Sequence, residues 1–364
     1  MQRAGHQVRI AERASEIKAV GAGLALAGNA MRALHSIGAG ELTEQAGKPL
    51  EKAEILVPSG KVIARTNLTK PINGHTLIGR TLLRADLHQL LFNLLPVNTV
   101  HTGLTVQRFA ESENGVQLIF SDGTSWQGDL LIAADGINSV IRKQLLPDVK
   151  PRFSGYTCWR GITAPIVNTD SIKFTETWGV KGRFGICPLN DNRVYWYACV
   201  NTPKENDPAY QNWTLDELKK QFSGYHYPVN ELLAATDSTQ VMHNDIVDIV
   251  PLQQLAFGRV VLLGDAGHAT TPNLGQGACQ AIEDAVILPK FISDSASVEA
   301  SLKAFSDLRL PRTTKIVERS LLFGQIAQTD NRLLAGIRNL LMQLTPESIS
   351  RKQIEFIHHV DFGS

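Results

Sequence analysis

The sequence predicts an α/β fold in which a Rossmann-like domain, built from two separated pieces of the chain, flanks an inserted and mostly antiparallel β domain. Two apolar runs, residues 128–134 and 259–263, are bounded by glycine and aspartate as buried parallel strands often are. Between them, residues 153–242 are rich in the aromatic and β-branched residues typical of strands. Helical patterns dominate the C-terminal part. We therefore expect the first domain at residues 1–150 and 243–310, the second at 151–242, and C-terminal helices at 311–364.

The start of the chain has an unusual order of elements. Residues 1–5 resemble the last turn of a helix closed by Gly5, and residues 6–11 form a short predicted strand that ends at Glu12. A domain seldom opens with the final turn of a helix, so we expect a segment to precede it. Residues 21–28 are small and apolar, which predicts a loop, and a helix is expected from Asn29.

Further along, the expected elements alternate between strands and helices. A β pair is predicted at residues 53–62, a helix at 84–95, and strands at 100–109 and 115–120. A helix is predicted at residues 275–288, and residues 301–343 are predicted to be helical with an interruption at Pro311.

Composition excludes several classes of function. The chain carries 36 basic and 35 acidic residues, so no strong overall field attracts nucleic acid or an anionic membrane. No run of about 18 apolar residues predicts a transmembrane helix, and the N-terminus lacks the apolar core of a signal peptide, so a cytoplasmic protein is expected. The four cysteines show no metal-binding spacing and are predicted to be buried thiols, with no metal site.

The strongest motif lies in residues 259–285, where a predicted buried strand ends at Gly264-Asp265. The Asp265 carboxylate can accept hydrogen bonds from sugar-like hydroxyl groups. Pro272 then stiffens a loop, and Gly275-Gln276-Gly277 opens a helix. The free N–H groups at a helix start favour an electron-rich ligand edge. A plain glycine-rich turn is the alternative, and the length of the motif argues against it.

At these residues the sequence resembles the FAD-dependent aromatic hydroxylases of the para-hydroxybenzoate hydroxylase-like family. Residues 128–142 resemble the second signature of that family, with Asp135, Gly136 and Arg142 in place, although alone they could be a strand–turn–helix junction. The resemblance implies that FAD binds at residues 275–277 and at the two strand ends, and that NADH or NADPH is the reductant. The first domain is thus predicted to be a Rossmann-like FAD-binding domain.

The resemblance implies further FAD contacts. Glu12 matches the acid that binds the adenosine ribose, Arg13 follows it, and Arg84 matches an arginine near the pyrophosphate, which a guanidinium fork suits. Val106 falls at a backbone contact to adenine, and Ala25 at a minor contact. Without the resemblance, Glu12 could be a solvated carboxylate at a strand end and Arg84 a charge at a helix start.

The predicted substrate domain resembles the branch of salicylate and FAD-dependent urate hydroxylases at residues 155–161 and 182–189. Where the urate enzymes use an Asn, an Arg and a Tyr, this chain has Cys158, Arg183 and Tyr195. A thiol cannot replace the donors and acceptor of an amide, so urate is not the expected substrate. Arg183 and Tyr195 are expected to position the substrate, although Arg183 could instead pair with a surface acid.

The glycine-rich phosphate loop of dinucleotide-binding folds is not found where it is expected. It would lie roughly 20 residues before the ribose-binding acid, and counting back from Glu12 passes Met1. That loop would supply two or three hydrogen bonds of about 1.5–3 kcal/mol each to the pyrophosphate. We therefore expect a Rossmann-like domain that is truncated at its N-terminus and FAD binding that is weakened.

The leading expectation is an NAD(P)H- and FAD-dependent monooxygenase. The resemblance implies that a flavin C4a-hydroperoxide, formed with O2, hydroxylates a small aromatic or heteroaromatic substrate, with Pro272 in the loop over C4a and His268 structural. Two alternatives stay open: an FAD-dependent epoxidase, because carotenoid epoxidases share both signatures, and a flavin-free remnant without catalysis. The sequence does not decide between a monomer and a homodimer.

Overall fold

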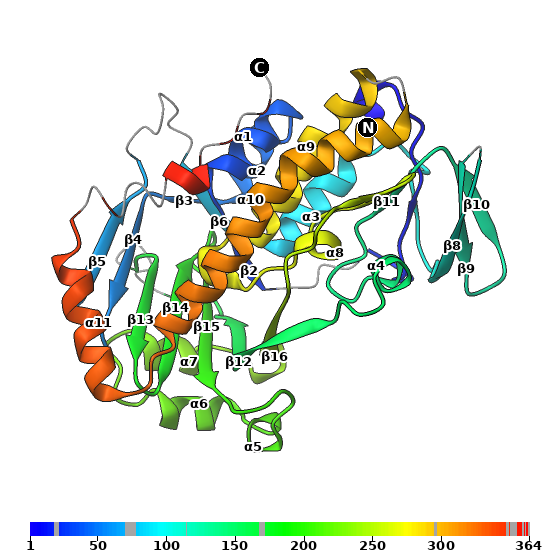
Figure 1. Ribbon diagram of the computed structural model, residues 1–364. Helices are drawn as coiled ribbons and strands as arrows, with labels where there is room; N and C mark the ends of the chain where they lie inside the picture. The colour runs from blue at the N-terminus through cyan, green and yellow to red at the C-terminus, as the bar shows by residue number, and fades with distance from the viewer. Residues whose placement is uncertain are drawn as a thin grey trace.

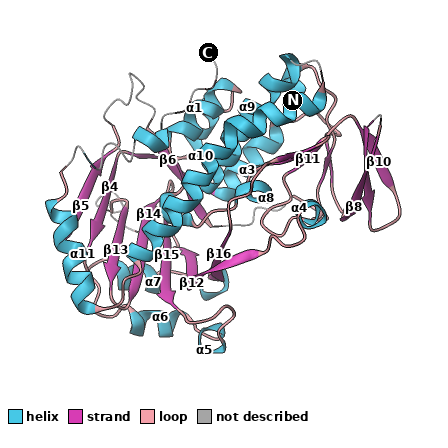
Figure 2. Ribbon diagram, in the orientation of Figure 1, coloured by secondary structure: helices cyan, strands magenta, loops and turns pink. Residues whose placement is uncertain are grey.

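The computed structural model describes residues 1–17, 22–69, 78–113, 115–166, 172–294, 297–346, 349, 355–358, 360 and 362. Figure 1 shows two layers of structure: helices α1, α9 and α10 with small sheets around them, and a large sheet below. Helices and strands are thus mixed as the α/β prediction requires, and Figure 2 shows the large sheet with helices on both sides. No helix among the described residues is long and apolar enough to cross a membrane.

The first part of the chain forms short elements. They are η1 (Gln2–Ala4), β1 (Ile10–Ala11), β2 (Gly23–Leu26), α1 (Gly28–Ser36), α2 (Gly40–Ala46), β3 (Lys48–Leu50), β4 (Lys52–Leu56), β5 (Val62–Asn67), β6 (Gly79–Leu83), α3 (Arg84–Asn93), β7 (Val100–His101), β8 (Val106–Ser112), β9 (Gly115–Phe120), β10 (Ser125–Gly128), β11 (Leu131–Ala133) and α4 (Val140–Leu145).

The second part contains longer strands and helices. They are β12 (Pro151–Ile162), β13 (Thr175–Gly179), β14 (Gly182–Pro188), β15 (Val194–Asn201), α5 (Pro208–Gln211), α6 (Leu215–Gln221), α7 (Val229–Ala234), η3 (Ser238–Gln240), β16 (Met242–Ile249), β17 (Ala256–Phe257), β18 (Val260–Leu262), α8 (Asp265–His268), η4 (Pro272–Leu274), α9 (Gly277–Asp294), α10 (Val298–Ala327) and α11 (Arg332–Leu344).

The parallel strands of the first domain lie in two separate small sheets. β1 pairs with β7, and β11 pairs with β18, both in parallel. The predicted loop at residues 21–28 is wrong for its described part, because residues 23–26 form β2, which pairs with β6. Leu26 is fully buried there, so pairing and burial outweigh the small-residue composition that suggested a loop.

The large sheet has seven strands in the order β16-β12-β15-β14-β13-β4-β5. All neighbours are antiparallel except β13 and β4, which confirms the prediction of a mostly antiparallel sheet. The sheet extends past residues 151–242 at both edges, because β4 and β5 come from the first piece of the chain and β16 runs to Ile249. These outer strands match the predicted β pair at residues 53–62 and the end of the aromatic region.

Helix α10 runs without interruption through Pro311, so the predicted break at that residue is wrong. Pro311 and Asp307, whose carbonyl loses its helical partner, both lie on the exposed side of the helix, where water can replace the missing hydrogen bond. The helical region is divided instead at residues 328–331, where the side chain of Asn331 caps α11 by accepting hydrogen bonds from the N–H groups of Leu333 and Leu334.

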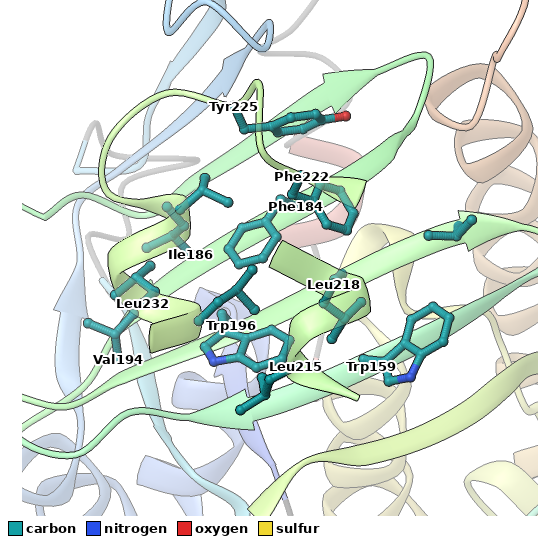
Figure 3. Close-up of a cluster of buried hydrophobic side chains, with 14 residues drawn as sticks. Trp159, Phe184, Ile186, Val194, Trp196, Leu215, Leu218, Phe222, Tyr225 and Leu232 are labelled. Atoms are coloured by element: carbon teal, nitrogen blue, oxygen red, sulfur yellow. The ribbon is translucent and has the colours of Figure 1, made fainter. Parts of the chain in front are cut away.

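Two faces of the large sheet are covered differently. The face toward α6 and α7, called the outer face here, carries an apolar cluster that includes Trp159, Phe184 and Trp196 (Figure 3). The opposite face, the inner face, lies toward η4 and α10, which crosses in front of β14 and β15 in Figure 1. Because side chains alternate along each strand, neighbouring residues of one strand belong to different faces.

Candidate active site

The two signature segments meet at the carboxyl ends of β11 and β18. The N–H of Leu263 donates to the carbonyl of Ala133 at 2.9 Å, so Asp135-Gly136 and Gly264-Asp265 follow neighbouring strands. Gly136 (φ 79°) and Gly264 (φ 54°) take left-handed backbone conformations that favour glycine. The structure therefore brings together four residues that the sequence motifs predict to contact FAD.

Arg142 ties the two signatures to each other. Its buried guanidinium donates to the carbonyl oxygens of Asp265 and Ala266 at 3.3 and 2.9 Å, and also to that of Ile137. The Asp135 carboxylate accepts from the N–H groups at the start of α4, the nearer, Val140, at 2.8 Å. Arg142 and Asp135 thus fix the backbone here, whereas Asp265 is exposed beside the start of α9.

Residues 275–277 form an open cradle at the start of α9. Gly275 adopts φ 61°, and a Cβ atom added there would meet no atom within 4 Å. A Cβ atom at Gly277 would have the Asp265 carboxylate oxygen at 3.9 Å. The first N–H groups of a helix have no acceptor within the helix, so this cradle offers donors and space to an electron-rich ring edge. Its donors and its space fit the flavin that the motif predicts.

A buried polar network supports the cradle from behind. Gln276 is fully buried, and its Oε1 accepts hydrogen bonds from the Asn29 and Gln280 side chains, both at 3.0 Å. About two turns beyond Gln276, Asp284 accepts from His268 Nε2 at 2.6 Å and from the Gly264 N–H at 3.0 Å. His268 is therefore held inside the protein by Asp284, which suits a structural role better than that of a catalytic base.

Charged groups complete this network. Arg309 donates to Asp284 and Glu283 at 2.8 and 2.6 Å. Burial alone would raise the pKa of Asp284, but the nearby His268 and Arg309 outweigh it and lower the pKa to about 2. The network joins α1, α9 and α10 and so sets the position of the Gly275–Gly277 backbone.

The remaining predicted FAD contacts lie in two places. Ala25 on β2 and Arg84 at the start of α3 are connected through the β2–β6 pairing, and the Arg84 N–H donates to the carbonyl of Ala22 at 3.1 Å. Glu12 and Arg13 follow β1, and Val106 begins β8 nearby. The Glu12 carboxylate accepts from the N–H of Ala14 at 2.7 Å. Their contacts with FAD stay predictions.

The inner face of the large sheet carries its residues in rows that cross four strands. The strand register aligns the residues of β12, β15, β14 and β13 in turn. One row is Ile162, Tyr195, Cys187 and Phe174; the middle row is Arg160, Tyr197, Gly185 and Glu176; the third row is Cys158, Cys199, Arg183 and Trp178. The face therefore grades from an apolar row to rows with charged and hydrogen-bonding groups.

The middle row depends on a glycine. The ring of Tyr197 lies across Gly185, where an added Cβ atom would come within 2.0 Å of the ring. The Tyr197 hydroxyl thereby reaches over β14 and donates to the Glu176 carboxylate at 2.9 Å. Tyr197 is only partly buried, so its ring and hydroxyl border the space in front of the sheet.

Arg183 joins the inner face to the loop before the cradle. Its guanidinium is buried and donates to Glu176 at 2.9 Å, to Asn273 at 2.8 Å and to Gln328 at 2.7 Å. Asn273 lies between Pro272 and Leu274 and also accepts from the Tyr156 hydroxyl at 2.9 Å. In this arrangement Arg183 holds protein groups, so it pairs with a carboxylate that lies inside the protein rather than on its surface.

Tyr195 lies at the apolar end of the inner face. Its ring packs so closely against Gly23 that a Cβ atom there would be 2.4 Å from the ring. With Cys187 and Leu189 it forms an apolar cluster that Leu83 completes from the side of the first domain. Leu83 and Leu189 also line a neighbouring pocket of about 260 Å³, whose other walls are mostly polar and include Asp86 and Arg193. The apolar row therefore ends at this cluster, beside a polar pocket near α3.

Cations give the inner face a positive character. Arg160 is half-buried, and none of the described carboxylates forms an ion pair with it. A hydrogen bond with the Cys199 thiol lowers the pKa of Cys158, with help from Arg160 and Arg183, and the same hydrogen bond raises the pKa of Cys199. Burial raises the pKa of Tyr195 and Tyr197 on this face. Arg160 and Arg183 thus favour a negative charge close to them, against the effect of burial.

Several of these residues were missed by sequence reasoning. Arg160 lies within the motif that drew attention to Cys158, and its place two residues further on the same strand could have indicated a shared face. Asn273 stands between Pro272 and Gly275, so its position in the sequence also indicates that it lies near the cradle. Glu176 and Tyr197 carry no local signal, because only the strand register brings them together.

Comparisons with known proteins find similarity over nearly the whole chain. A family model for the FAD binding domain matches residues 1–320. The Aurachin C monooxygenase/isomerase of Stigmatella aurantiaca is 35% identical over 362 residues, which cover 98% of this chain and 94% of that protein. The 2-heptyl-3-hydroxy-4(1H)-quinolone synthase of Pseudomonas aeruginosa is 30% identical over 354 residues, covering 96% and 91%.

The fold is shared with a structure that contains both FAD and a ligand. The crystal structure of Klebsiella pneumoniae HpxO complexed with FAD and uric acid superposes with a TM-score of 0.88 at 28% identity, covering 98% of this chain and 92% of that one. The similarity therefore spans the cradle, the large sheet and the helices that cover its inner face.

Proposed function

The chain belongs to the FAD-binding-domain family of flavin-dependent hydroxylases and monooxygenases, and on this premise we propose that it hydroxylates a heteroaromatic ring bearing an apolar substituent, with NAD(P)H and O2 as co-substrates. In this proposal residues 1–150 and 243–310 hold FAD, and residues 151–242 with β4 and β5 hold the substrate. The observation that carries it is the link from the inner face to the cradle through Asn273 and Arg183.

The residues that would hold FAD are those gathered around the cradle. The N–H groups of residues 275–277 would donate to the flavin, Asp265 would accept from the ribityl or pyrophosphate region, and Arg84 would pair with the pyrophosphate. Glu12 and Arg13 would hold the adenosine ribose, with Ala25 and Val106 as lesser contacts. When bound, FAD supplies electrons taken from NAD(P)H and activates O2 for transfer of one oxygen atom.

The inner face would bind the ring of the substrate. Arg160, which lacks a carboxylate partner among the described residues, stabilises a negatively charged ring oxygen. The charge makes the ring more electron-rich and therefore more reactive toward an electrophilic oxygen. Tyr197, oriented by Glu176, hydrogen-bonds to the same ring oxygen or its neighbour. Arg183 acts as a positioning residue, because it orients Glu176 and Asn273 rather than touching the substrate.

The apolar row would bind the substituent. Ile162, Tyr195 and Cys187 offer an apolar surface that Leu189 and Leu83 extend. One of the similar proteins is named for the synthesis of such a compound, a quinolone with a heptyl chain. Urate binding would need an amide side chain at the edge of this face, where the chain has Cys158. Because a thiol cannot replace the donors and acceptor of an amide, a small polar purine is disfavoured.

Turnover with a matched substrate panel tests the proposal. The FAD-loaded chain is supplied with O2 and either NADH or NADPH, and with 2-heptyl-4(1H)-quinolone, unsubstituted 4(1H)-quinolone, salicylate or uric acid. We expect coupled hydroxylation of the alkylated ring, a higher KM for the bare ring, and no hydroxylated urate. Mass spectrometry and NMR identify the product and distinguish a ring hydroxyl from an epoxide.

The outcomes separate the parts of the proposal. Preferred turnover of urate or salicylate would contradict the role of the apolar row but leave the monooxygenase activity intact. NAD(P)H consumption that yields only hydrogen peroxide with every ring would contradict the assignment of the inner face as the substrate site.

A further inference from the structure

Helix α11 is oriented with its leucines away from the protein. Its exposed side carries six large apolar side chains whose exposed fractions lie between 48% and 74%. They are Leu333, Leu334, Ile337, Leu340, Leu341 and Leu344. The buried residues of the same helix are Ala335 and Arg338. A surface helix normally buries its apolar stripe and exposes its charges, so this arrangement is inverted.

The inverted orientation is fixed by specific contacts. The Arg338 guanidinium donates to the carbonyl oxygens of Ile326 and Ala327 at the end of α10, at 3.2 and 2.9 Å. It also lies 5.1 Å from the centre of the Trp178 ring. At the other end of the helix, Lys61 donates to Gln343 at 3.2 Å. Rotating the helix to bury the leucines would break these contacts, so the apolar side stays available.

The charges around this side point to an anionic surface. Helix α11 contains no carboxylate, and of its two arginines Arg338 is buried while Arg332, at the start of the helix, is exposed. Lys61 lies beside the last turn of the helix. The carboxylate of Asp330, which precedes the helix, accepts a hydrogen bond from Asn201. An apolar helix side flanked by cations is typical of helices that lie in the interface of an anionic lipid membrane. The near-zero net charge of the whole chain does not oppose this, because the attraction acts locally within about 10 Å.

Size favours a membrane over a second copy of the chain. A helix of 13 residues is about 20 Å long and about 10 Å wide. That strip is smaller than the roughly 800 Å² per partner that a stable dimer buries. Two copies paired through it would also bring together helices that carry arginine and no carboxylate. Thirteen residues are too few to span a bilayer, for which about 20 are needed.

We propose that α11 docks this protein on the surface of an anionic lipid membrane, with its exposed leucines inserted among the headgroups and acyl chains and Arg332 and Lys61 facing lipid phosphates. The inference is independent of the proposed substrate. Figure 1 shows α11 on the outer edge of the molecule beside β5, away from α9 and the cradle, so a membrane there leaves the site uncovered.

Vesicle flotation of the full chain tests this docking. Vesicles of phosphatidylglycerol and phosphatidylcholine in equal amounts are compared with vesicles of phosphatidylcholine alone. We expect wild-type protein to float with the mixed vesicles, and Leu334→Gln/Leu341→Gln to lose binding by about tenfold or more. Arg332→Gln should weaken binding to the mixed vesicles by about fivefold. Val97→Gln, which changes an apolar residue that is 90% exposed elsewhere, is the matched control and should bind like wild type.

Circular dichroism and thermal unfolding of the double variant confirm that it is folded, because the two leucines point away from the core. Equal flotation of wild type and the double variant would overturn the proposal. A second result would also overturn it: the wild-type protein does not float but forms a dimer in analytical ultracentrifugation, and the double variant loses that dimer. The apolar side would then bind a second copy of the chain. Turnover of dissolved substrate by the double variant keeps this result separate from the proposed activity.

Discussion

The two faces of the seven-stranded sheet are built by the same strands but hold different kinds of residue. On the outer face, Phe184 and Trp196 stack at 5.7 Å between ring centres and pack against α6 and α7. On the inner face, Arg183 and Tyr197 are bonded to Glu176, and Arg183 also donates to Asn273 in the loop before the cradle. Residues adjacent in sequence therefore face different surroundings, one the apolar cluster and the next the proposed substrate site.

The comparison predicts that substitutions on the two faces separate stability from activity. The largest effect is expected for Trp196→Ala, because Trp196 is fully buried and its indole N–H donates to Thr236. We expect the free energy of unfolding to fall by about 3–5 kcal/mol. Urea denaturation measures it. The neighbouring inner-face change Tyr195→Phe should cost less than about 1 kcal/mol, and equal losses for the two would contradict the division of the faces.

The next largest effect is expected for Asn273→Ala, which removes the link between the sheet and the cradle. Asn273 accepts from Arg183 and Tyr156 and donates to the Ser320 carbonyl at 2.9 Å. We expect kcat/KM to fall about a hundredfold, roughly 2.7 kcal/mol, with more NAD(P)H consumed without product. Asn67→Ala, at the exposed end of β5 on the same sheet and bonded to Thr69, is the control. If Asn273→Ala keeps the kcat/KM of the wild type and consumes no extra NAD(P)H per product, the link is not needed.

A smaller effect is expected for Tyr197→Phe, which keeps the ring over Gly185 but removes the hydroxyl that donates to Glu176. Stability should change by no more than about 1 kcal/mol, while kcat/KM falls about tenfold. Urea denaturation and steady-state kinetics are measured on the same variant. If the tyrosine were purely structural, its change would lower stability without changing kcat/KM per folded molecule.

The smallest effect concerns the pH dependence of the inner face. Hydrogen bonding to Cys199 and the nearby arginines lower the pKa of Cys158 below the ordinary value of a thiol, while the same hydrogen bond raises the pKa of Cys199. A lowered pKa means that the thiolate stabilises the fold above the ordinary thiol pKa, and that this contribution is lost as the pH falls through the lowered pKa. We expect a thiolate absorbance step below the ordinary thiol pKa that Cys158→Ser removes. If Cys158→Ser keeps the same absorbance step, the thiolate belongs to another cysteine.

Much of the architecture could be predicted from local patterns. Buried strands β11 and β18, the helices α1, α3 and α9, and the aromatic antiparallel region all follow from apolar periodicity and turn residues. The strand β2 was missed, since small residues such as Gly23 and Ala25 form a strand only because β6 pairs with them. The continuity of α10 through Pro311 was missed because it depends on which side of the helix faces solvent.

The arrangement of the candidate site was predictable where it lies within continuous motifs. Asp265 and residues 275–277 were expected close together because strand, loop and helix start follow each other along the chain. The role of Arg183 could not be predicted from local sequence, because its partners come from three distant segments. They are Glu176, Asn273 and Gln328. Long-range register and docking, rather than local sequence, decide whether a buried arginine binds a ligand or another side chain.

The most direct test of the account is a ligand titration of the FAD-loaded chain, followed by the flavin absorbance spectrum, with 2-heptyl-4(1H)-quinolone as the ligand. We expect a saturable spectral change in the wild type, because a ring on the inner face lies next to the cradle. Arg160→Gln should raise the Kd about tenfold or more, while Lys143→Gln, an exposed change on α4, should leave it unaltered. If Arg160→Gln titrates like the wild type, or no ring perturbs the flavin, the inner face is not the substrate site.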